Sequence, residues 1–363
     1  MTLHFPGLGT YQVTDILQMD DFTDDYRGQA LQFCQKWLQG NTEFVVPTSG
    51  STGQPKPIQL TRAQMAASAQ MTLEALGLGP GDRALVCLHP GYIAGIMMLV
   101  RGLVGDLALT VVNPSARPFA QIRGEQFAFT ALVPLQLQAM LAAGEIDDNL
   151  LIFNQMKAIL IGGAPVGSAL AVQLQVIQAP VYATYGMTET VSHIALRRLN
   201  GPLRSEYYMA LPGVILGQDP RGCLTITAPV TQGQTLITND RVRLIDARTF
   251  EWLGRADNVI NSGGVKIQVE KIENVVDKTL TYLGINRRFV VMGLPDERLG
   301  EQTTLVIEGD PLPPATRATL QAQLAIGLGR YEVPKSVRYC PIFPETATGK
   351  VDRNQLKAVV LAV

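Results

Sequence analysis

Short apolar runs alternate with helix-like segments in the first part of the chain, and this alternation constrains the fold more than any other feature. The runs lie at residues 43–46, 83–88, 107–112 and 127–133. Between the first two, Thr61 with Gln64 three positions on forms a capping-box pattern, and Gly77 is a natural helix stop. Residues 156–166 and 179–190 read as further strands that run into loops. The pattern is typical of βα units around a largely parallel sheet.

The pattern changes near residue 222. Segments 222–229, 234–246 and 250–260 read as short antiparallel strands. After Gly264 we expect a strand at 265–269, a helix at about 270–280, two strands within 288–307, a helix near 315–326 and a final strand. A chain of 363 residues exceeds one ordinary core. We therefore predict a large domain over 1–256, built of βα units with an added antiparallel subdomain, and a small α+β domain over 257–363.

Composition excludes several classes of protein. Lys and Arg total 30 against 31 for Asp and Glu, which predicts no nucleic-acid partner and no anionic membrane surface. The four cysteines form no C-x-x-C pair, so neither a zinc site nor a disulfide framework is expected. The N-terminus lacks the features of a signal peptide, and the apolar stretch 91–113 is interrupted by charge. A reducing cytoplasm fits best.

The stretch "PTSGSTGQPKPIQL" at residues 47–60 is the first candidate site. Its glycines permit close backbone approach, its hydroxyls can donate hydrogen bonds, and its lysine supplies a positive charge, so it can wrap an oxyanion. The candidates are Thr48, Ser49, Gly50, Ser51, Thr52, Gly53 and Lys56. It is not a P-loop, because the lysine lies between two prolines. A flexible linker is the alternative, although linkers rarely lie between a buried strand and a capped helix.

Four further elements carry polar chemistry. Glu189 in "TYGMTET" suits Mg²⁺, which takes one or two carboxylates plus phosphate oxygens, although an N-cap box for a following helix explains it equally well. Asp240 in "TND" and Arg255 with Asp257 in "GRADN" suit ribose hydroxyls, or are ordinary turns and ion pairs. Lys350 in "ETATGKVDR" is either functional or a solvated tail lysine.

In this order the elements resemble the motifs of the acyl-adenylate-forming superfamily of acyl-CoA synthetases, adenylation domains and luciferases. "TSGSTGQPK" resembles its phosphate loop, "GGAPV" at 162–166 its adenine-side turn and "YGMTET" its magnesium loop. "TND", "GRADNVINSGGVKI" and "TGKVDR" resemble its remaining motifs. Together the matches span residues 48–353. The resemblance implies the acyl-adenylate synthetase fold, with a small mobile C-terminal domain.

The resemblance also implies the reaction and its cofactors. A small-molecule carboxylic acid and ATP form an acyl-AMP and pyrophosphate, and a thiol, usually that of coenzyme A, then displaces AMP. By resemblance, residues 48–56 hold the β- and γ-phosphates, while Gly163, Ala164, Tyr185 and Gly186 border the adenine. Thr188 contacts the α-phosphate, Glu189 binds Mg²⁺, and Asp240 and Arg255 hold the ribose. Lys350 bridges the attacking carboxylate and the α-phosphate, where a cation offsets two anions.

A lysine so far from the phosphate loop implies domain closure. In this family the C-terminal domain rotates between the two steps, and Asp257 occupies the hinge position. Gly263 and Gly264 line the path of the thiol, where glycines allow close passage. The chain also departs from the family pattern, since its phosphate loop begins at residue 48 where a hundred or more residues usually precede it. We therefore expect a shortened N-terminal region.

Within the superfamily, "YIAG" and "YGMTETVSHIALRRLNG" most resemble the o-succinylbenzoate CoA ligases of menaquinone biosynthesis. Such an acid carries a second carboxylate, for which Tyr92, Ser192, His193 and Arg101 are candidate ligands. His193 could equally be a helix-face residue capped by solvent, and His89 reads as a pocket-wall or structural histidine. The alternatives are a ligase for another aryl or short-chain acid, one that loads a carrier protein, or a non-catalytic AMP- or ATP-binding protein. A homodimer is compatible with the sequence, which is silent on oligomeric state.

Overall fold

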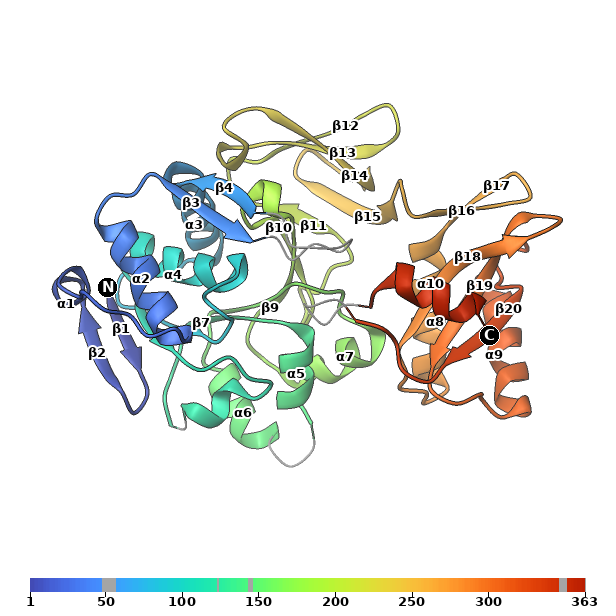
Figure 1. Cartoon of the computed structure of the whole chain (residues 1–363), viewed down its shortest axis with the longest axis horizontal. Helices are drawn as coiled ribbons and strands as arrows, with labels where there is room; N and C mark the ends of the chain where they lie inside the picture. The colour runs from blue at the N-terminus through green and yellow to red at the C-terminus, as the bar shows by residue number, and fades with distance from the viewer. Residues whose placement is uncertain (48–56, 123, 143–145, 346–350, 363) are drawn as a thin grey trace.

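The computed structural model describes residues 1–47, 57–122, 124–142, 146–345 and 351–362. The strands of this part of the chain form a 13-stranded sheet, a 5-stranded sheet and a separate two-stranded hairpin. Figure 1 shows the long sheet with its helices in one part of the molecule and the smaller sheet beside it. The arrangement matches the predicted combination of a βα region, an antiparallel addition and a small α+β region.

The centre of the long sheet is parallel and its ends are antiparallel. Strands β1, β6, β5, β7, β8 and β9 run parallel in that spatial order. Beyond β9 the sheet continues antiparallel through β10, β11, β15, β14, β13 and β12, and β2 closes the other edge. The strands are β1 (Thr2–Phe5), β2 (Gly9–Gln12), β5 (Arg83–Val86), β6 (Ala108–Val111), β7 (Phe129–Leu132), β8 (Ala158–Ile161), β9 (Val181–Gly186), β10 (His193–Arg198), β11 (Tyr208–Ala210), β12 (Ile215–Gln218), β13 (Cys223–Thr227), β14 (Thr235–Leu244) and β15 (Thr249–Arg255).

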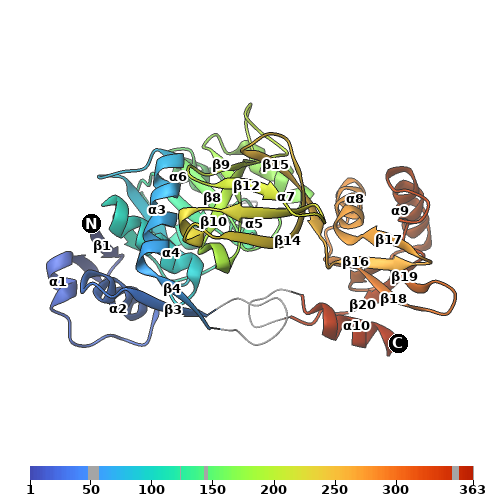
Figure 2. The same cartoon turned by 90° about the horizontal axis from the view of Figure 1, so that it is seen from above.

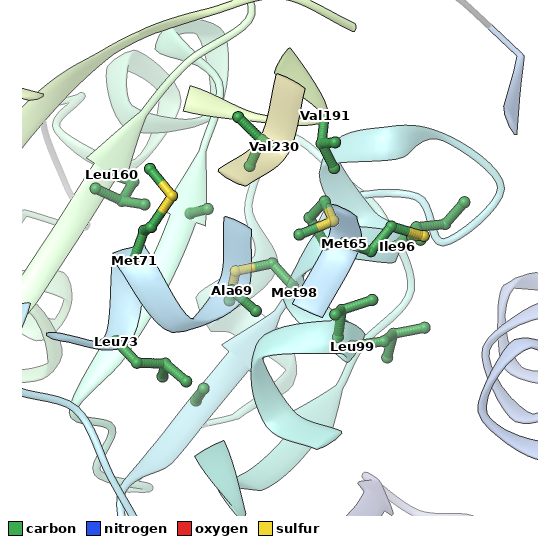
Figure 3. Close-up of a cluster of buried hydrophobic side chains, with 14 of the residues drawn as sticks. Met65, Ala69, Met71, Leu73, Ile96, Met98, Leu99, Leu160, Val191 and Val230 are labelled. Atoms are coloured by element: carbon green, nitrogen blue, oxygen red, sulfur yellow. The ribbon is translucent and has the colours of Figure 1, made fainter. Parts of the chain in front are cut away.

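Alternate side chains of the parallel strands enter two different cores. In β5, Ala84 belongs to one buried cluster and Leu85 to the other, and in β8 Leu160 and Ile161 divide in the same way. This follows from the two-residue period of a strand, and both faces are apolar because helices cover both. Helices α3 (Arg62–Leu76) and α4 (Ile93–Gly105) cover the first face, as Figure 3 shows, whereas α5 (Pro134–Met140), α6 (Ile146–Phe153) and α7 (Ser168–Gln173) cover the second.

Helix α3 has the predicted ends. The Thr61 hydroxyl accepts from the Gln64 backbone N–H, and the Gln64 side chain accepts from the Thr61 N–H, which completes the capping box. Gly77 ends the helix in the left-handed region at φ 62°. The well-defined ends hold α3 in register against α4 and β10, where it contributes a side chain to the site described below.

The start of the predicted βα pattern was wrong. Strand β3 (Glu43–Pro47) lies outside the long sheet and pairs antiparallel with β4 (Pro57–Thr61). The predicted phosphate loop, which lies outside the described residues, therefore joins two strands of a hairpin and does not lead directly into a helix. The error arose because the proline and polar residues at 57–61 hide a strand. Sequence reasoning also gave no element before residue 43, where β1, β2, α1 (Val13–Leu17) and α2 (Tyr26–Leu38) lie.

The small sheet contains the elements predicted after Gly264 and one helix that was missed. Its strands run in the order β17, β16, β19, β18, and β20 pairs parallel with β19. Two buried clusters, separate from those of the long sheet, pack it against its helices. The elements are β16 (Val259–Ser262), β17 (Val265–Gln268), α8 (Val269–Tyr282), β18 (Phe289–Asp296), β19 (Gly300–Glu308), α9 (Pro314–Gly327), β20 (Ser336–Cys340) and the missed α10 (Arg353–Leu361). The domain boundary at 256/257 stays a prediction.

One hydrogen bond joins the helices of the two regions. The Asp277 carboxylate of α8 accepts from the backbone N–H of Ser168 at 2.6 Å, at the first turn of α7. The N-cap of α7 is Gly167, which has no side chain of its own to satisfy this donor, so Asp277 does so from the neighbouring region. Figures 1 and 2 both place α8 beside α7. None of the helices in the described residues is long and apolar enough to cross a membrane.

Candidate active site

The loop after β9 brings the predicted adenine and magnesium residues to the carboxyl end of the parallel strands. Tyr185 and Gly186 end β9, and the short 3₁₀ turn η3 (Thr188–Thr190) follows. A Cβ on Gly186 would lie 2.3 Å from the Ser192 carbonyl oxygen, so only glycine allows the chain to return this closely. The Glu189 side chain is exposed in η3. An exposed carboxylate fits a magnesium ion that takes its remaining ligands from phosphate and water.

The predicted ribose aspartate is held by two aromatic side chains. The Tyr185 hydroxyl donates to Asp240 Oδ2 at 2.8 Å, and the Trp252 indole N–H donates to Asp240 Oδ1 at 3.1 Å. Burial and the Asp240 charge raise the pKa of Tyr185, so this phenol remains a donor. Each carboxylate oxygen keeps a free lone pair. Asp240 can therefore accept a further hydroxyl, as a ribose contact requires.

The predicted ribose arginine and hinge aspartate form one ion pair. Asp240 and Arg255 lie opposite each other in the β14–β15 ladder. Arg255 Nε and Nη2 donate to the two Asp257 oxygens at 2.8 and 2.6 Å, and this hydrogen-bonded pairing lowers the pKa of Asp257. Both side chains are about half exposed, so the pair is weak and can exchange partners. The arginine predicted to hold the ribose thus pairs with the aspartate predicted to be the hinge.

Three of the glycines predicted to line cofactors have positive φ angles. Gly163 after β8 has φ 83°, and Ala164 beside it is exposed. Gly263 and Gly264, at 59° and 83°, are the two turn residues between β16 and β17. A two-residue hairpin with both φ angles positive calls for glycine whether or not a thiol passes. The predicted thiol path therefore stays a prediction, because the geometry of the turn alone also explains the two glycines.

A buried polar cluster lies directly behind the magnesium loop. Arg101 of α4 is 2% exposed, and its Nη2 donates to the Ser192 hydroxyl at 3.0 Å. No carboxylate among the described residues pairs with this guanidinium. Its Nη1 donates to the Met98 sulfur at 3.8 Å, and its Nε has no hydrogen-bond partner there. Burial lowers the pKa of Arg101 to about 10, which leaves it charged at neutral pH. A buried cation without an anion is costly to the fold, so Arg101 is a candidate for binding an anionic ligand.

His193 completes this cluster beneath the surface. It is 6% exposed, and its Nε2 lies 3.2 Å from the Thr72 hydroxyl of α3 while its Nδ1 lies 3.3 Å from the Ser192 hydroxyl. Burial, with the Arg101 charge second, lowers the pKa of His193 well below its ordinary value of 6.5. The residue is therefore neutral, and both of its ring nitrogens are already engaged by hydroxyl groups of the protein.

The remaining predicted residues have different outcomes. Residues 48–56 and Lys350 lie outside the described residues, so their roles stay predictions. Tyr92 precedes α4 and is 46% exposed. Its ring packs edge-on against the His89 ring, with 5.4 Å between the ring centroids, and it is not among the hydrogen-bond partners of Arg101 in the described residues. The expectation of a helix after the magnesium loop was wrong, because strand β10 begins at His193 and pairs with β9. His193 is accordingly a buried strand residue and not a solvent-capped helix residue.

Sequence reasoning missed two partners that the fold supplies. Trp252 holds the predicted ribose aspartate, and Thr72 holds His193. Trp252 lies three residues before Arg255 in "FEWLGR", a position that strand pairing could have placed opposite the "TND" strand. Thr72 lies in an apolar stretch of α3 and carries no local signal.

Comparison with known proteins shows the family. The model of the AMP-binding enzyme family matches residues 14–252. An acyl-CoA synthetase (AMP-forming)/AMP-acid ligase II-like protein from Dyadobacter fermentans has a solved structure that is 46% identical, with a TM-score of 0.64, over 96% of this chain and 99% of that one. A probable 2-succinylbenzoate–CoA ligase from Mycobacterium tuberculosis is 30% identical over 88% of this chain and 85% of its own length. The chain therefore belongs to the AMP-binding enzyme family.

The fold class and the class of enzyme predicted from the motifs are confirmed. An o-succinylbenzoate CoA synthetase from Bacillus subtilis, solved with an acyl-adenylate intermediate, shares the fold with a TM-score of 0.71 at 22% identity over 86% of this chain and 68% of that one. The same enzyme was also solved with ATP and magnesium ion. The chain is an AMP-forming ligase, and the predicted ATP, Mg²⁺ and coenzyme A are the cofactors of that class.

The depressed pKa of His193 predicts a specific loss of stability in acid. In the unfolded chain this ring takes up a proton as the pH falls through its ordinary value of 6.5, whereas the folded protein keeps it neutral. Stability from His193 is thus present above pH 6.5 and is lost as the pH falls below it. Between pH 6.5 and about pH 5.5 the free energy of unfolding should fall by about 1 kcal/mol more in the wild type than in His193→Gln.

Urea unfolding curves of both proteins across this pH range measure the difference. The glutamine variant cannot titrate, so the contributions of all other groups cancel in the comparison. Parallel curves for the two proteins would contradict the assignment of a neutral, buried His193.

Proposed function

We propose that the chain joins o-succinylbenzoate to coenzyme A by way of an acyl-adenylate. The acid and ATP form the acyl-AMP with release of pyrophosphate, and the thiol then displaces AMP to give the thioester. The observation that carries the proposal is the buried Arg101 guanidinium, which contacts Ser192 three residues after Glu189 and has no carboxylate partner in the described residues. It fits an acid that brings a second carboxylate.

The number of carboxylates in each candidate acid favours o-succinylbenzoate. Benzoate or a short fatty acid has one carboxylate, which is consumed at the α-phosphate and cannot also neutralise Arg101. o-Succinylbenzoate has two, so one reacts while the other offsets the buried charge through charge-assisted hydrogen bonds. Ser192 is partly exposed and links the guanidinium to the loop surface. The relatives from Mycobacterium tuberculosis and Lactococcus lactis, which carry the 2-succinylbenzoate–CoA ligase name, support the same substrate.

The nucleotide roles follow the predicted motifs. Residues 48–56 would hold the β- and γ-phosphates, Thr188 the α-phosphate and Glu189 the Mg²⁺, while Gly163, Ala164, Tyr185 and Gly186 would border the adenine. Asp240 would accept a ribose hydroxyl with the lone pairs that Tyr185 and Trp252 leave free. Bound Mg²⁺ would supply positive charge against the phosphates. Arg255 would join Asp240 at the ribose after leaving Asp257, an exchange that their exposed ion pair permits.

We also propose that residues 257–363 act as the mobile domain that carries Lys350 to and from the site. The separate hydrophobic clusters of the small sheet support this division. The hinge would be Asp257, directly after β15. Asp277 and Ser168 would then form one of the contacts that must break during rotation. A cytoplasmic location is supported by four buried cysteines that are all free.

The substrate proposal predicts the outcome of a mass-spectrometric assay with ATP, Mg²⁺ and coenzyme A. The acids are o-succinylbenzoate, benzoate, short fatty acids and no acid. We expect the thioester of o-succinylbenzoate in preference to all others, with AMP in equal amount. The reason is that only this acid in the panel brings a second anion for Arg101.

Two other outcomes would separate the parts of the proposal. AMP and a thioester formed from another acid would keep the reaction and discard the substrate. No AMP with any acid would favour a non-catalytic nucleotide-binding protein and contradict the proposed activity as a whole.

Domain rotation predicts that the two half-reactions respond to different residues. Lys350→Ala should suppress adenylate formation by about a hundredfold or more but largely spare thioester formation from supplied acyl-AMP. Asp257→Pro should slow thioester formation more than adenylation, because a fixed φ restricts the hinge. Each half-reaction is followed in single-turnover kinetics.

The chain offers a matched control for each variant. Lys357→Ala removes a lysine of α10 that pairs with Glu301, and Asp257→Ala breaks the Arg255 pair without restricting φ. Equal losses in both half-reactions for Lys350→Ala, or an unchanged ratio of rates for Asp257→Pro, would refute this division of labour.

A further inference from the structure

The polar cluster behind the magnesium loop is a single chain of hydrogen bonds drawn from three elements. Arg101 of α4 reaches Ser192, Ser192 reaches His193 of β10, and His193 reaches Thr72 of α3, at 3.0, 3.3 and 3.2 Å. Thr72 is fully buried and lies 3.0 Å from the carbonyl oxygen of Ser68 in the same helix. This row of hydrogen bonds thus starts at the Arg101 guanidinium, which has no carboxylate partner in the described residues, and ends at the Ser68 carbonyl oxygen.

The chemistry of each group fixes the direction of this chain. The Ser68 carbonyl can only accept, so the single proton of the Thr72 hydroxyl goes to it. Thr72 must then accept from His193 Nε2, which therefore carries the ring proton. His193 Nδ1 is left as an acceptor for the Ser192 hydroxyl proton. Ser192 in turn presents a lone pair to Arg101 Nη2, so every bond in the chain has one donor and one acceptor.

The backbone holds Ser192 in this chain through a strained turn. The Ser192 N–H donates to the Thr190 carbonyl at 2.7 Å, and Val191 between them has φ 65° and ψ −54°. This is a γ-turn of the rare form, which costs a β-branched residue energy and is typical of functional sites. The Val191 side chain is buried with Met65 and Ile96, as Figure 3 shows. Packing of that side chain therefore offsets the strain and fixes where the Ser192 hydroxyl lies.

We propose that His193 is a positioning residue for the second carboxylate of the substrate, acting as a neutral ring protonated on Nε2. It orients the Ser192 hydroxyl so that Ser192 accepts one Arg101 N–H. The guanidinium N–H groups that bind neither Ser192 nor the Met98 sulfur stay available to an aryl dicarboxylic acid. His193 itself does not contact the acid. This inference rests on the proposed function for the identity of the carboxylate, but the direction of the hydrogen bonds does not depend on it.

The tautomer is tested first, without any substrate. The chain has three histidines, so a long-range ¹H–¹⁵N correlation spectrum of histidine-labelled protein is simple, and His193→Gln assigns the signal. We expect protonated Nε2 and unprotonated Nδ1 at neutral pH. Thr72→Val, an isosteric change that removes the acceptor, should shift the tautomer populations. A ring protonated on Nδ1, or on both nitrogens, would overturn the proposal whatever the enzyme ligates.

The positioning role is tested by the kinetics of a matched pair of acids. These are o-succinylbenzoate and 4-oxo-4-phenylbutanoate, which lacks only the ring carboxylate. His193→Phe and Thr72→Val should each raise KM for the dicarboxylate about tenfold, with kcat and the kinetics of the monocarboxylate nearly unchanged. His193→Gln, whose amide can both donate and accept, should recover part of the loss. His4→Phe is the control at a histidine of β1, whose ring contacts Thr10 of β2, and should alter the kinetics of neither acid.

The outcomes separate this inference from the proposed function. Equal losses for both acids in Thr72→Val would indicate a merely structural role and overturn the positioning proposal. If the protein shows the Nε2–H tautomer but does not ligate o-succinylbenzoate, the proposed substrate is wrong and the direction of the hydrogen bonds stands. If it ligates o-succinylbenzoate efficiently but has the Nδ1–H tautomer, the proposed substrate stands and the positioning role of His193 is wrong.

Discussion

An arginine that is buried without a carboxylate partner in the described residues is the constraint on which the proposed acyl end of the site depends. Arg101 lies on α4, whose apolar side chains pack against α3 and the parallel sheet, so the guanidinium cannot reach bulk water. The guanidinium donates to the Ser192 hydroxyl and to the Met98 sulfur, and its Nε has no partner in the described residues. An unpaired charge of this kind destabilises the free protein and is worth keeping only where a ligand completes it.

The nucleotide end depends on the junction between parallel and antiparallel strands. Residues that end β9 meet residues of β14 and β15, so Tyr185, Asp240 and Arg255 converge although they are distant in sequence. The same junction continues into the small sheet through Asp257. Under the proposed roles, a nucleotide that draws Arg255 to its ribose would break the hydrogen bonds between Arg255 and Asp257. The Asp277 cap on α7 gives the small region a second attachment to the large one.

The sequence predicts those parts of the molecule that local patterns determine. The capping box at Thr61 and the Gly77 stop carry their information within a few residues, and the structure confirms both. The hairpin of β3 and β4 was missed because its second strand begins at a proline and reads as loop. The Thr72–His193 contact was missed because it depends on how α3 crosses β10, and no spacing in the sequence encodes it. The alternative that placed His193 on a helix face was wrong for the same reason, since pairing with β9 and not local propensity makes it a strand residue.

The most direct test of the account is a double-mutant cycle between Arg101 and the ring carboxylate of the substrate. The values of kcat/KM are measured for o-succinylbenzoate and for 4-oxo-4-phenylbutanoate with the wild type and with Arg101→Leu. Arg62→Leu, an arginine of α3 that binds the Trp37 carbonyl and lies over the Trp37 ring, is the control. The account predicts that the wild type and the control prefer the dicarboxylate by about a hundredfold, and that Arg101→Leu abolishes the preference while folding at least as stably. A preference that survives in Arg101→Leu would contradict the central claim, because the second carboxylate would then be recognised elsewhere.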